Sequence, residues 1–227
     1  MTPAAYRDAV RLQTSVLAAA EKRLLVRIAH RLPGWVNSDH LTVLGGLAML
    51  GAGVGYWLSA RYPAALVLVV VCLGINWFGD SLDGTVARVR NRQRPRYGFY
   101  VDHVLDTLGV LFILTGLGLS GHMTPMVAVV VLAAYYLLSI EIYLATVVLR
   151  TFRMGFAGFG PTELRILLAI GTLALFDHAT VTLAGRSFLL FDVGGVIAAA
   201  GMVAFFLVSA AQNTWALYKE EPAASSS

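Results

Sequence analysis

Six long apolar runs constrain the fold of this chain more than any other feature of its sequence. A helix needs roughly 20 apolar residues to cross the ~30 Å hydrocarbon core of a bilayer. The candidate spans, of which the fifth is the shortest, are 41–60, 63–88, 98–120, 125–149, 162–176 and 193–217. This pattern predicts an all-α fold, that of a polytopic membrane protein with six transmembrane helices.

The composition supports a membrane-embedded chain and excludes several soluble classes. Of the 227 residues, 58% are hydrophobic and 13% are charged, whereas about 25% are charged in a typical soluble domain. A single cysteine excludes an intramolecular disulfide and a thiolate metal cluster. The length fits one transmembrane domain over 41–217, with a cytoplasmic amphipathic segment over 1–40 and a small, polar, disordered tail over 218–227.

The basic residues are distributed unevenly between the two sides that six spans would create. Six spans place both termini on one side, and 15 of the 17 Lys and Arg residues fall there. Only Arg61 and Arg186 fall on the other side. By the positive-inside rule, both termini and the 89–97 loop face the cytoplasm, as in a protein of the cell inner membrane. The membrane therefore explains the basic balance, and we expect no nucleic-acid partner.

The segment before the first span has the pattern of an amphipathic helix. Its apolar residues fit one helical face, flanked by Lys and Arg; they are Leu17, Leu24, Leu25, Ile28 and Leu32. Such a helix lies on the membrane surface beside the first span. The alternative, compatible with the first, is a short helix that packs on the cytoplasmic ends of the bundle.

Four aspartates lie where an apolar span should contain none. Asp80 and Asp83 are near the end of the second span, and Asp102 and Asp106 are near the start of the third. If they faced lipid, inserting all four would cost on the order of 10 kcal/mol, so they must face the bundle interior or a watery cavity. Each pair shares one helix face because its members are three or four residues apart. The short connection makes the two spans antiparallel neighbours and places all four aspartates at similar depth, near the cytoplasm.

Four converging carboxylates must share protons or bind cations. An all-oxygen donor set suits Mg²⁺, Mn²⁺ or Ca²⁺. Four carboxylates are enough for two ions, and two-metal sites move phosphoryl groups because they hold both the attacking and the leaving oxygen. A cation-coupled membrane transporter is the alternative from another class, since intramembrane Asp residues also serve ion pathways.

The spacing of the aspartates and their neighbours resembles the signature of the CDP-alcohol phosphotransferase (CDP-alcohol phosphatidyltransferase) family. The family pattern is D-x-x-D-G-x-x-A-R, a spacer, and then G-x-x-x-D-x-x-x-D. This sequence matches every fixed position of the pattern, with Asp80, Asp83, Gly84, Ala87, Arg88, Gly98, Asp102 and Asp106. Together with the six-span layout, the resemblance extends over most of the chain.

The resemblance implies a phospholipid-synthesising transferase that cleaves a CDP-linked donor, releases CMP and joins the phospho group to an acceptor alcohol. It implies that the four Asp side chains hold divalent metal, two ions of Mg²⁺ or Mn²⁺, and that Asp106 is the general base for the acceptor hydroxyl. It assigns the CDP portion of the donor to Gly84, Ala87, Arg88 and Gly98, with Arg88 also assisting catalysis. Homodimers are common in the family.

The chain departs from the family pattern around the donor site. Many members begin the first span with Asn-x-x-Thr; here Asp39 stands in place of the Asn and Thr42 is kept, and both are candidate donor-site residues. The spacer between the two halves of the motif holds nine residues, one more than is usual. Arg94, Pro95 and Arg96 occupy a region where a hydroxyl residue often helps to bind the nucleotide.

Two chemistries use this motif, and the sequence leaves both open. One moves a phosphatidyl group from CDP-diacylglycerol to a small polar alcohol, and the short six-span chain favours it. The other moves a phospho-aminoalcohol from CDP-choline or CDP-ethanolamine to diacylglycerol. Glu141, in the fourth span, and Arg150 and Arg153, on the cytoplasmic side, are candidates for the acceptor site. Glu141 could equally be a buried carboxyl bonded to a hydroxyl, and the arginines could simply follow the positive-inside rule.

Overall fold

The computed structural model describes residues 10–13, 18–149, 151–154 and 161–221 of the chain. Across these residues the chain is mainly helical, with four short strands. The helices are α1 (Ala18–Arg31), α2 (Ser38–Ser59), α3 (Ala65–Val89), α4 (Pro95–Ser120), α5 (Pro125–Leu149), α6 (Pro161–Ala174) and α7 (Leu190–Glu220). The strands are β1 (Val10–Gln13), β2 (Thr151–Met154), β3 (Thr180–Leu183) and β4 (Arg186–Leu189). Each of the six apolar runs therefore forms a helix.

Five helices are long and apolar enough to cross a membrane: α2, α3, α4, α5 and α7. The chain is therefore that of a polytopic integral membrane protein. Helix α6 has only 14 residues, which span about 21 Å at 1.5 Å per residue. That is less than the hydrocarbon core, so the sixth crossing stays a prediction.

Local signals in the sequence explain where several helices begin and end. The Asn37 side chain accepts a hydrogen bond from the His40 backbone N–H at 2.9 Å and so caps the start of α2. Pro95 stands at the start of α4, where its missing N–H costs nothing. Gly121 ends α4 with φ of 80°, a left-handed conformation that glycine adopts without strain.

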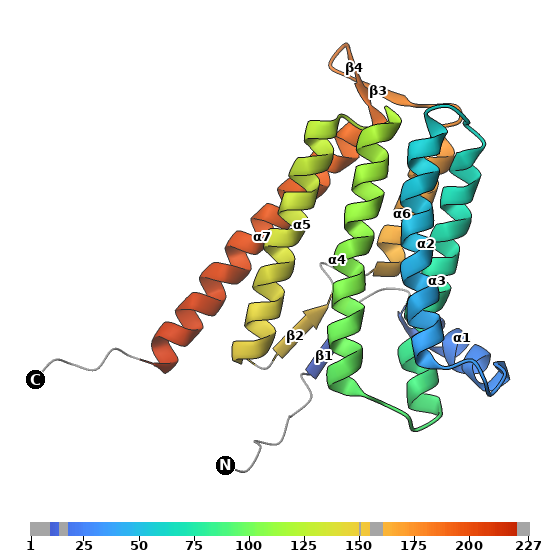
Figure 1. Cartoon of the computed structure of the whole chain (residues 1–227). Helices are drawn as coiled ribbons and strands as arrows, with labels where there is room; N and C mark the ends of the chain where they lie inside the picture. The colour runs from blue at the N-terminus through green and yellow to red at the C-terminus, as the bar shows by residue number, and fades with distance from the viewer. Residues whose placement is uncertain (1–9, 14–17, 150, 155–160, 222–227) are drawn as a thin grey trace, which may run out of the picture.

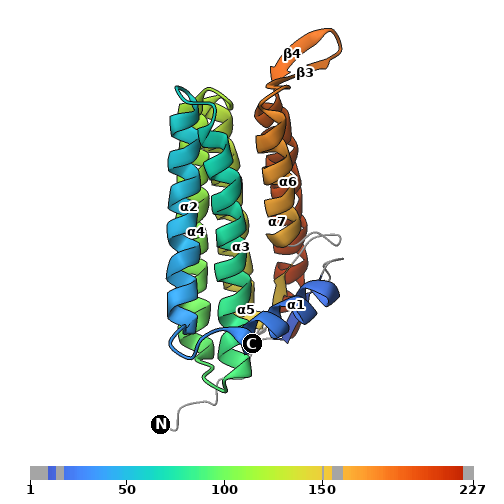
Figure 2. The ribbon, with the colours of Figure 1, turned by 90° about the vertical axis from the view of Figure 1, so that its right-hand side faces the viewer.

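The long helices run side by side, as Figures 1 and 2 show. At one end of the bundle lie the α3–α4 connection, the C-terminal end of α7 and α1, which crosses below the bundle. The β3–β4 hairpin lies at the opposite end. The hairpin turns through Ala184 and Gly185, both with positive φ, which suits a two-residue connection between antiparallel strands.

Helix α2 packs against both α3 and α4 at glycines. A Cβ atom at Gly79 of α3 would collide with the backbone of α2 at Gly45, and one at Gly116 of α4 would collide with the backbone at Gly53. Backbones that approach this closely need residues without side chains. The sequence predicts that the second and third spans are direct neighbours, but α3 and α4 touch little. The glycine-rich α2 lies between them and brings them together.

Helix α1 docks on the bundle through a small apolar cluster. Leu25 and Ala29 are buried against Leu82 and Val86 of α3. This is the packing that the second interpretation of the N-terminal segment predicts. Contact of α1 with a membrane surface stays a prediction, and Leu17 lies outside the described residues.

The all-α expectation misses four strands. β1 pairs in parallel with β2, and β3 pairs with β4 in an antiparallel hairpin. Strands of four residues carry too little periodicity to be read from a sequence. Helix α7 continues through Glu220, so it enters the segment predicted as a disordered tail; residues 222–227 lie outside the described part of the chain.

Candidate active site

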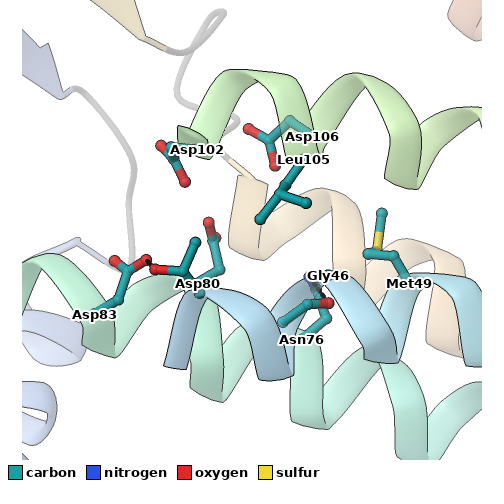
Figure 3. Close-up of a pocket in the computed structure, with 10 residues that line it drawn as sticks. Gly46, Met49, Asn76, Asp80, Asp83, Asp102, Leu105 and Asp106 are labelled. Carbon is teal, nitrogen blue, oxygen red and sulfur yellow. Dashed lines mark hydrogen bonds between the residues drawn. The ribbon is translucent and has the colours of Figure 1, made fainter. Parts of the chain in front are cut away.

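Three carboxylates converge in a pocket between α2, α3 and α4. Asp80 projects from α3, and Asp102 and Asp106 project from α4 (Figure 3). One oxygen from each of the three lies within 4.8 Å of the others. The i, i+4 spacing of Asp102 and Asp106 places both on the face of α4 that meets the pocket. The structure thus brings together three of the four aspartates that the sequence predicts to converge.

Asp83 lines the same pocket (Figure 3) but is not one of the three aspartates whose oxygens lie within 4.8 Å of one another. Its Oδ2 accepts a hydrogen bond of 2.6 Å from Thr42 Oγ1 on α2, and its Oδ1 contacts the Gly84 N–H. Thr42, a candidate donor-site residue, therefore reaches the cluster by fixing Asp83.

Arg165 on α6 enters the site and was not placed there by the sequence motif. Its Nη2 donates to Asp80 Oδ2 at 2.5 Å and its Nε donates to Asn76 Oδ1 at 2.6 Å. Asn76 in turn donates to the Gly45 carbonyl of α2 at 3.1 Å. The Arg165 side chain is only 14% exposed. The signal available in the sequence is a basic residue inside the fifth apolar run, which fits a phosphate ligand or the positive-inside rule alone.

A second, larger hollow opens at the end of the bundle where α3 joins α4. It is lined by the start of α2, the end of α3 and the connection between α3 and α4, including Asp39, Ala87, Arg90 and Arg94. Asp39 forms an ion pair with Arg94 at the mouth of this hollow. Two of the three departures from the family pattern, those at Asp39 and at Arg94, therefore meet in space.

The remaining donor-site candidates lie along the same end of the bundle. Arg88 is exposed and folds back over its own helix, where its Nη2 donates to Thr85 Oγ1 at 3.0 Å. A Cβ atom at Gly84 would lie 3.3 Å from the Arg88 guanidinium, so glycine leaves room for it. Gly98 is exposed in the first turn of α4, with open space around it.

Among the acceptor candidates, only Glu141 has a described side chain, and it does not line the carboxylate pocket. Glu141 is buried between α5 and α7, where its Oε1 accepts from Ser209 Oγ at 2.9 Å and from Asn213 Nδ2 at 2.7 Å. Its Oε2 is buried without a hydrogen-bond partner among the described residues. Arg150 lies outside the described residues. Arg153 falls in β2, where the structure describes the backbone only.

The donor set at the pocket fits a hard divalent cation. Three carboxylates offer oxygen ligands at close range, and Asp83 offers a fourth from the same pocket. Such ligands suit Mg²⁺ or Mn²⁺. Carboxylates this close repel one another unless a cation or shared protons compensate them, and Arg165 supplies one positive charge on the Asp80 side. The arrangement can therefore hold a divalent cation.

Comparisons with known proteins find a relative in sequence and a similar fold. The 29% identity to the archaetidylinositol phosphate synthase of Pyrococcus horikoshii extends over 119 residues, 52% of this chain and 60% of that relative. The match thus spans less than two thirds of the relative's length. In fold, the chain is similar to the crystal structure of the Mycobacterium tuberculosis phosphatidylinositol phosphate synthase with CDP-DAG bound. That similarity has a TM-score of 0.60 at 17% identity and covers 90% of this chain and 98% of the other.

The family model for CDP-alcohol phosphatidyltransferases matches residues 35–208. This range contains all four aspartates, the whole of α2 to α6 and most of α7. The sequence signature, the pocket that it lines and the extent of this match agree, and the chain belongs to the CDP-alcohol phosphatidyltransferase family.

Proposed function

We propose that this protein is a phospholipid-synthesising transferase that uses CDP-diacylglycerol as its donor, releases CMP and forms a phosphodiester with a polar acceptor alcohol. The observation that carries the proposal is the convergence of Asp80, Asp102 and Asp106 in one pocket inside an apolar bundle. Family membership supports the class of reaction. The similar Mycobacterium tuberculosis synthase, whose crystal structure holds CDP-DAG, supports a CDP-diacylglycerol donor.

Asp106 is the general base in this proposal. Its carboxylate takes the proton of the acceptor hydroxyl, and the resulting oxygen attacks the phosphorus that carries the diacylglycerol group. The bond from that phosphorus to the bridging pyrophosphate oxygen breaks, and CMP leaves. Proton removal by a positioned carboxylate contributes about 10²- to 10⁴-fold in typical enzymes.

Asp80, Asp83, Asp102 and Asp106 are the proposed ligands of two divalent ions, Mg²⁺ or Mn²⁺. Bound there, the metal would supply positive charge to the pyrophosphate and to the departing CMP. Thr42 keeps Asp83 oriented at the pocket wall.

The donor binds, in this proposal, across the end of the bundle where α3 joins α4. Gly84, Ala87 and Gly98 let the nucleotide phosphates approach the backbone, and Arg88 pairs with a phosphate. Asp39 lines the neighbouring hollow. The donor's nucleotide would then lie at the water-exposed end, with its acyl chains along the apolar helices.

The acceptor side is proposed to involve Glu141, Arg150 and Arg153. A phosphorylated polar alcohol is a suitable acceptor class, because arginine binds phosphate oxygens in a bidentate manner. Transfer of phosphocholine or phosphoethanolamine to diacylglycerol is the alternative within the family. The experiment below separates the two, because each donor and acceptor pair is offered separately.

We also propose a topology for the protein in its membrane. Helix α6 is the sixth crossing, helix α1 lies at the cytoplasmic surface, and both termini and the site face the cytoplasm of the cell inner membrane. The uneven distribution of Lys and Arg supports this orientation. A homodimer is the proposed assembly.

Release of CMP by the purified protein in detergent tests the proposal. CDP-diacylglycerol is offered with a panel of alcohols that includes phosphorylated polyols, and CDP-choline or CDP-ethanolamine is offered with diacylglycerol. We expect CMP from CDP-diacylglycerol, dependent on Mg²⁺ or Mn²⁺ and abolished by a chelator. If no pair yields CMP, and cation-dependent solute flux is found in reconstituted vesicles, the transferase proposal is wrong.

A further inference from the structure

One carboxylate oxygen on α1 joins parts of the molecule that are distant in the sequence. Oε1 of Glu21 accepts hydrogen bonds from Trp77 Nε1 at 2.7 Å and from Ser81 Oγ at 3.2 Å, both on α3. It also accepts one from Thr162 Oγ1 at 2.8 Å, in the first turn of α6. Hydrogen bonds to an ionised acceptor are roughly twice as strong as those between neutral groups. Glu21 therefore ties α1, α3 and α6 together at one point.

This tie lies directly beside the carboxylate cluster. On α3, Trp77 precedes Asp80 by three residues, which is less than one helical turn. On α6, Thr162 and Arg165 are also three residues apart and share a helix face. Glu21 thus holds the same two helices that the Arg165–Asp80 ion pair joins, one turn away from that ion pair.

Helix α1 is well placed to act as a fixed support. Glu21, Leu25 and Ala29 are spaced four residues apart and so lie along one face of α1. Leu25 and Ala29 bury that face against Leu82 and Val86 of α3. The polar tie at Glu21 continues this apolar contact in the direction of α6. The apolar packing of Leu25 and Ala29 therefore fixes where Glu21 lies relative to α3.

Helix α6 needs such a support at its start. Besides the bonds of Arg165 to Asp80 and Asn76, a hydrogen bond of 2.6 Å joins Thr172 Oγ1 to Tyr56 OH, ten residues beyond Thr162 along α6. Without the Glu21 contact, the first turn of α6 would lose one of the bonds that hold it against α3, and Arg165 lies one turn away. Loss of the Arg165 contact would leave Asp80 free to rotate away from Asp102.

We propose that Glu21 is a positioning residue for the carboxylate site: it fixes the first turn of α6 against α3 and thereby keeps Arg165 on Asp80. The proposal rests on the proposed transferase function for its kinetic consequence, but its structural consequence stands apart from catalysis. Misplacement of a reacting group by about 1 Å can cost 10²-fold in rate. Glu21 touches no substrate in this account and acts through Arg165.

Two variants of Glu21 and one matched control test the proposal. Glu21→Ala removes the acceptor, whereas Glu21→Gln keeps an acceptor oxygen for the same three donors. Tyr56→Phe is the control, because it removes the hydrogen bond at the other end of α6, away from the carboxylates. Each variant of the full chain is purified in detergent. Backbone hydrogen–deuterium exchange is measured over α6, together with kcat and KM for CMP release from CDP-diacylglycerol.

We expect Glu21→Ala to speed exchange at residues 165–168 and to lower kcat about tenfold with little change in the donor KM. Glu21→Gln should keep both the exchange rate and kcat close to those of the unaltered protein. Tyr56→Phe should speed exchange only near residue 172. In an Arg165→Gln background, Glu21→Ala should lower kcat no further, because the two residues act in series.

Three results would overturn the proposal. These are unchanged exchange at the start of α6 in Glu21→Ala, a kcat loss in Tyr56→Phe as large as that in Glu21→Ala, or additive losses with Arg165→Gln. If the unaltered protein releases no CMP, the transferase function fails by that result alone. The exchange measurement then decides whether Glu21 positions α6.

Discussion

At the scale of single residues, Asp80 is the side chain that links Arg165 to the other carboxylates of the site. Its carboxylate accepts from Arg165 at 2.5 Å and lies within reach of Asp102 and Asp106. Asp83, one turn along the same helix, is instead bound to Thr42. The two aspartates of α3 therefore differ in surroundings although the sequence motif treats them alike. We therefore expect substitutions of Asp80 and of Asp83 to have different effects on metal binding and similar effects on the fold.

Asp106→Asn is expected to abolish turnover while it leaves donor binding largely intact. The amide is nearly the same size as the carboxylate but cannot take a proton from the acceptor hydroxyl. A loss of about 10²- to 10⁴-fold in kcat is expected for a missing general base. CMP release and binding of CDP-diacylglycerol are measured on the same preparation. Weakened donor binding with turnover retained would contradict the assignment.

The Asp39–Arg94 ion pair is expected to weaken donor binding electrostatically. Asp39→Asn removes a negative charge from a hollow that should receive an anionic pyrophosphate and frees the Arg94 guanidinium. The Kd for CDP should therefore fall a few-fold, whereas Arg94→Gln should raise it. Stability should change by less than about 1 kcal/mol, because the pair is solvent-exposed.

Calorimetric titration with CDP at two salt concentrations measures both effects of the Asp39–Arg94 pair. Arg186→Gln, in the hairpin at the opposite end of the bundle, is the charge-matched control and should leave the Kd unchanged. An equal change in Kd from the control would show that net charge alone is responsible.

At the scale of elements, glycines decide how the helices approach. Gly45 and Gly53 lie on α2 two turns apart, and each faces a glycine on a neighbouring helix, α3 or α4. These contacts set the distance between the Asp80 side of the pocket and the Asp102 side. The aspartates therefore converge because α2 has almost no side-chain volume at these positions.

Gly116→Ala is expected to destabilise the protein. The added methyl would collide with the α2 backbone at Gly53, which cannot turn away as a side chain could. Overpacking of a tight interior typically costs about 1–3 kcal/mol, so the melting temperature in detergent should fall. Gly201→Ala on α7 is the control, since nothing lies within 4 Å of its Cβ position. An equal or greater loss in the control would show that the α2–α4 contact is not the cause.

Glu141 is expected to support the pairing of α5 with α7. Glu141→Ala leaves Ser209 and Asn213 without their acceptor and should cost about 1–3 kcal/mol in stability. Glu141→Gln keeps one acceptor oxygen and should cost less. Thermal unfolding and the acceptor KM are measured for both variants. A raised acceptor KM with unchanged stability would instead support a place for Glu141 in the acceptor site.

At the scale of the whole molecule, the two ends of the bundle differ in character. One end carries α1, the α3–α4 connection and the wide hollow, and the other carries the β3–β4 hairpin. The carboxylates lie nearer the first end, so a water-soluble nucleotide can reach them without crossing the apolar middle of the bundle. The uneven distribution of Lys and Arg predicts that this end faces the cytoplasm.

Site-directed labelling is expected to place the two ends on opposite sides of the membrane. In a Cys72→Ser background, Gln93→Cys should react with a membrane-impermeant maleimide only after the cells are permeabilised. Ser187→Cys, in the hairpin, should react in intact cells. Both positions are exposed. Labelling of both positions from the same side would show that α6 does not cross and that the six-span topology is wrong.

The sequence predicts the helices and the residue types of the site better than it predicts the tertiary contacts between residues. Apolar runs and the aspartate spacing act over short stretches of chain, so the helix ranges and the carboxylate cluster could be read directly. Arg165 and Glu21 reach the site through tertiary packing, at 85 and 56 residues from their α3 partners Asp80 and Trp77, and no local pattern encodes such pairs. The strands were too short to detect. Thr42 and its partner Asp83 are 41 residues apart in the sequence, so only the fold brings them together.

The glycine contacts also have a mechanical consequence. Backbone packed directly on backbone, with no side chains between, makes α2, α3 and α4 a stiff unit that resists deformation. Helices α6 and α7 are attached through longer side chains, such as Arg165 to Asp80 and Ser209 to Glu141. Helices α6 and α7 should therefore move more easily than α2, α3 and α4. If the site opens and closes around a substrate, we expect α6 and α7 to move while α2, α3 and α4 stay fixed relative to one another.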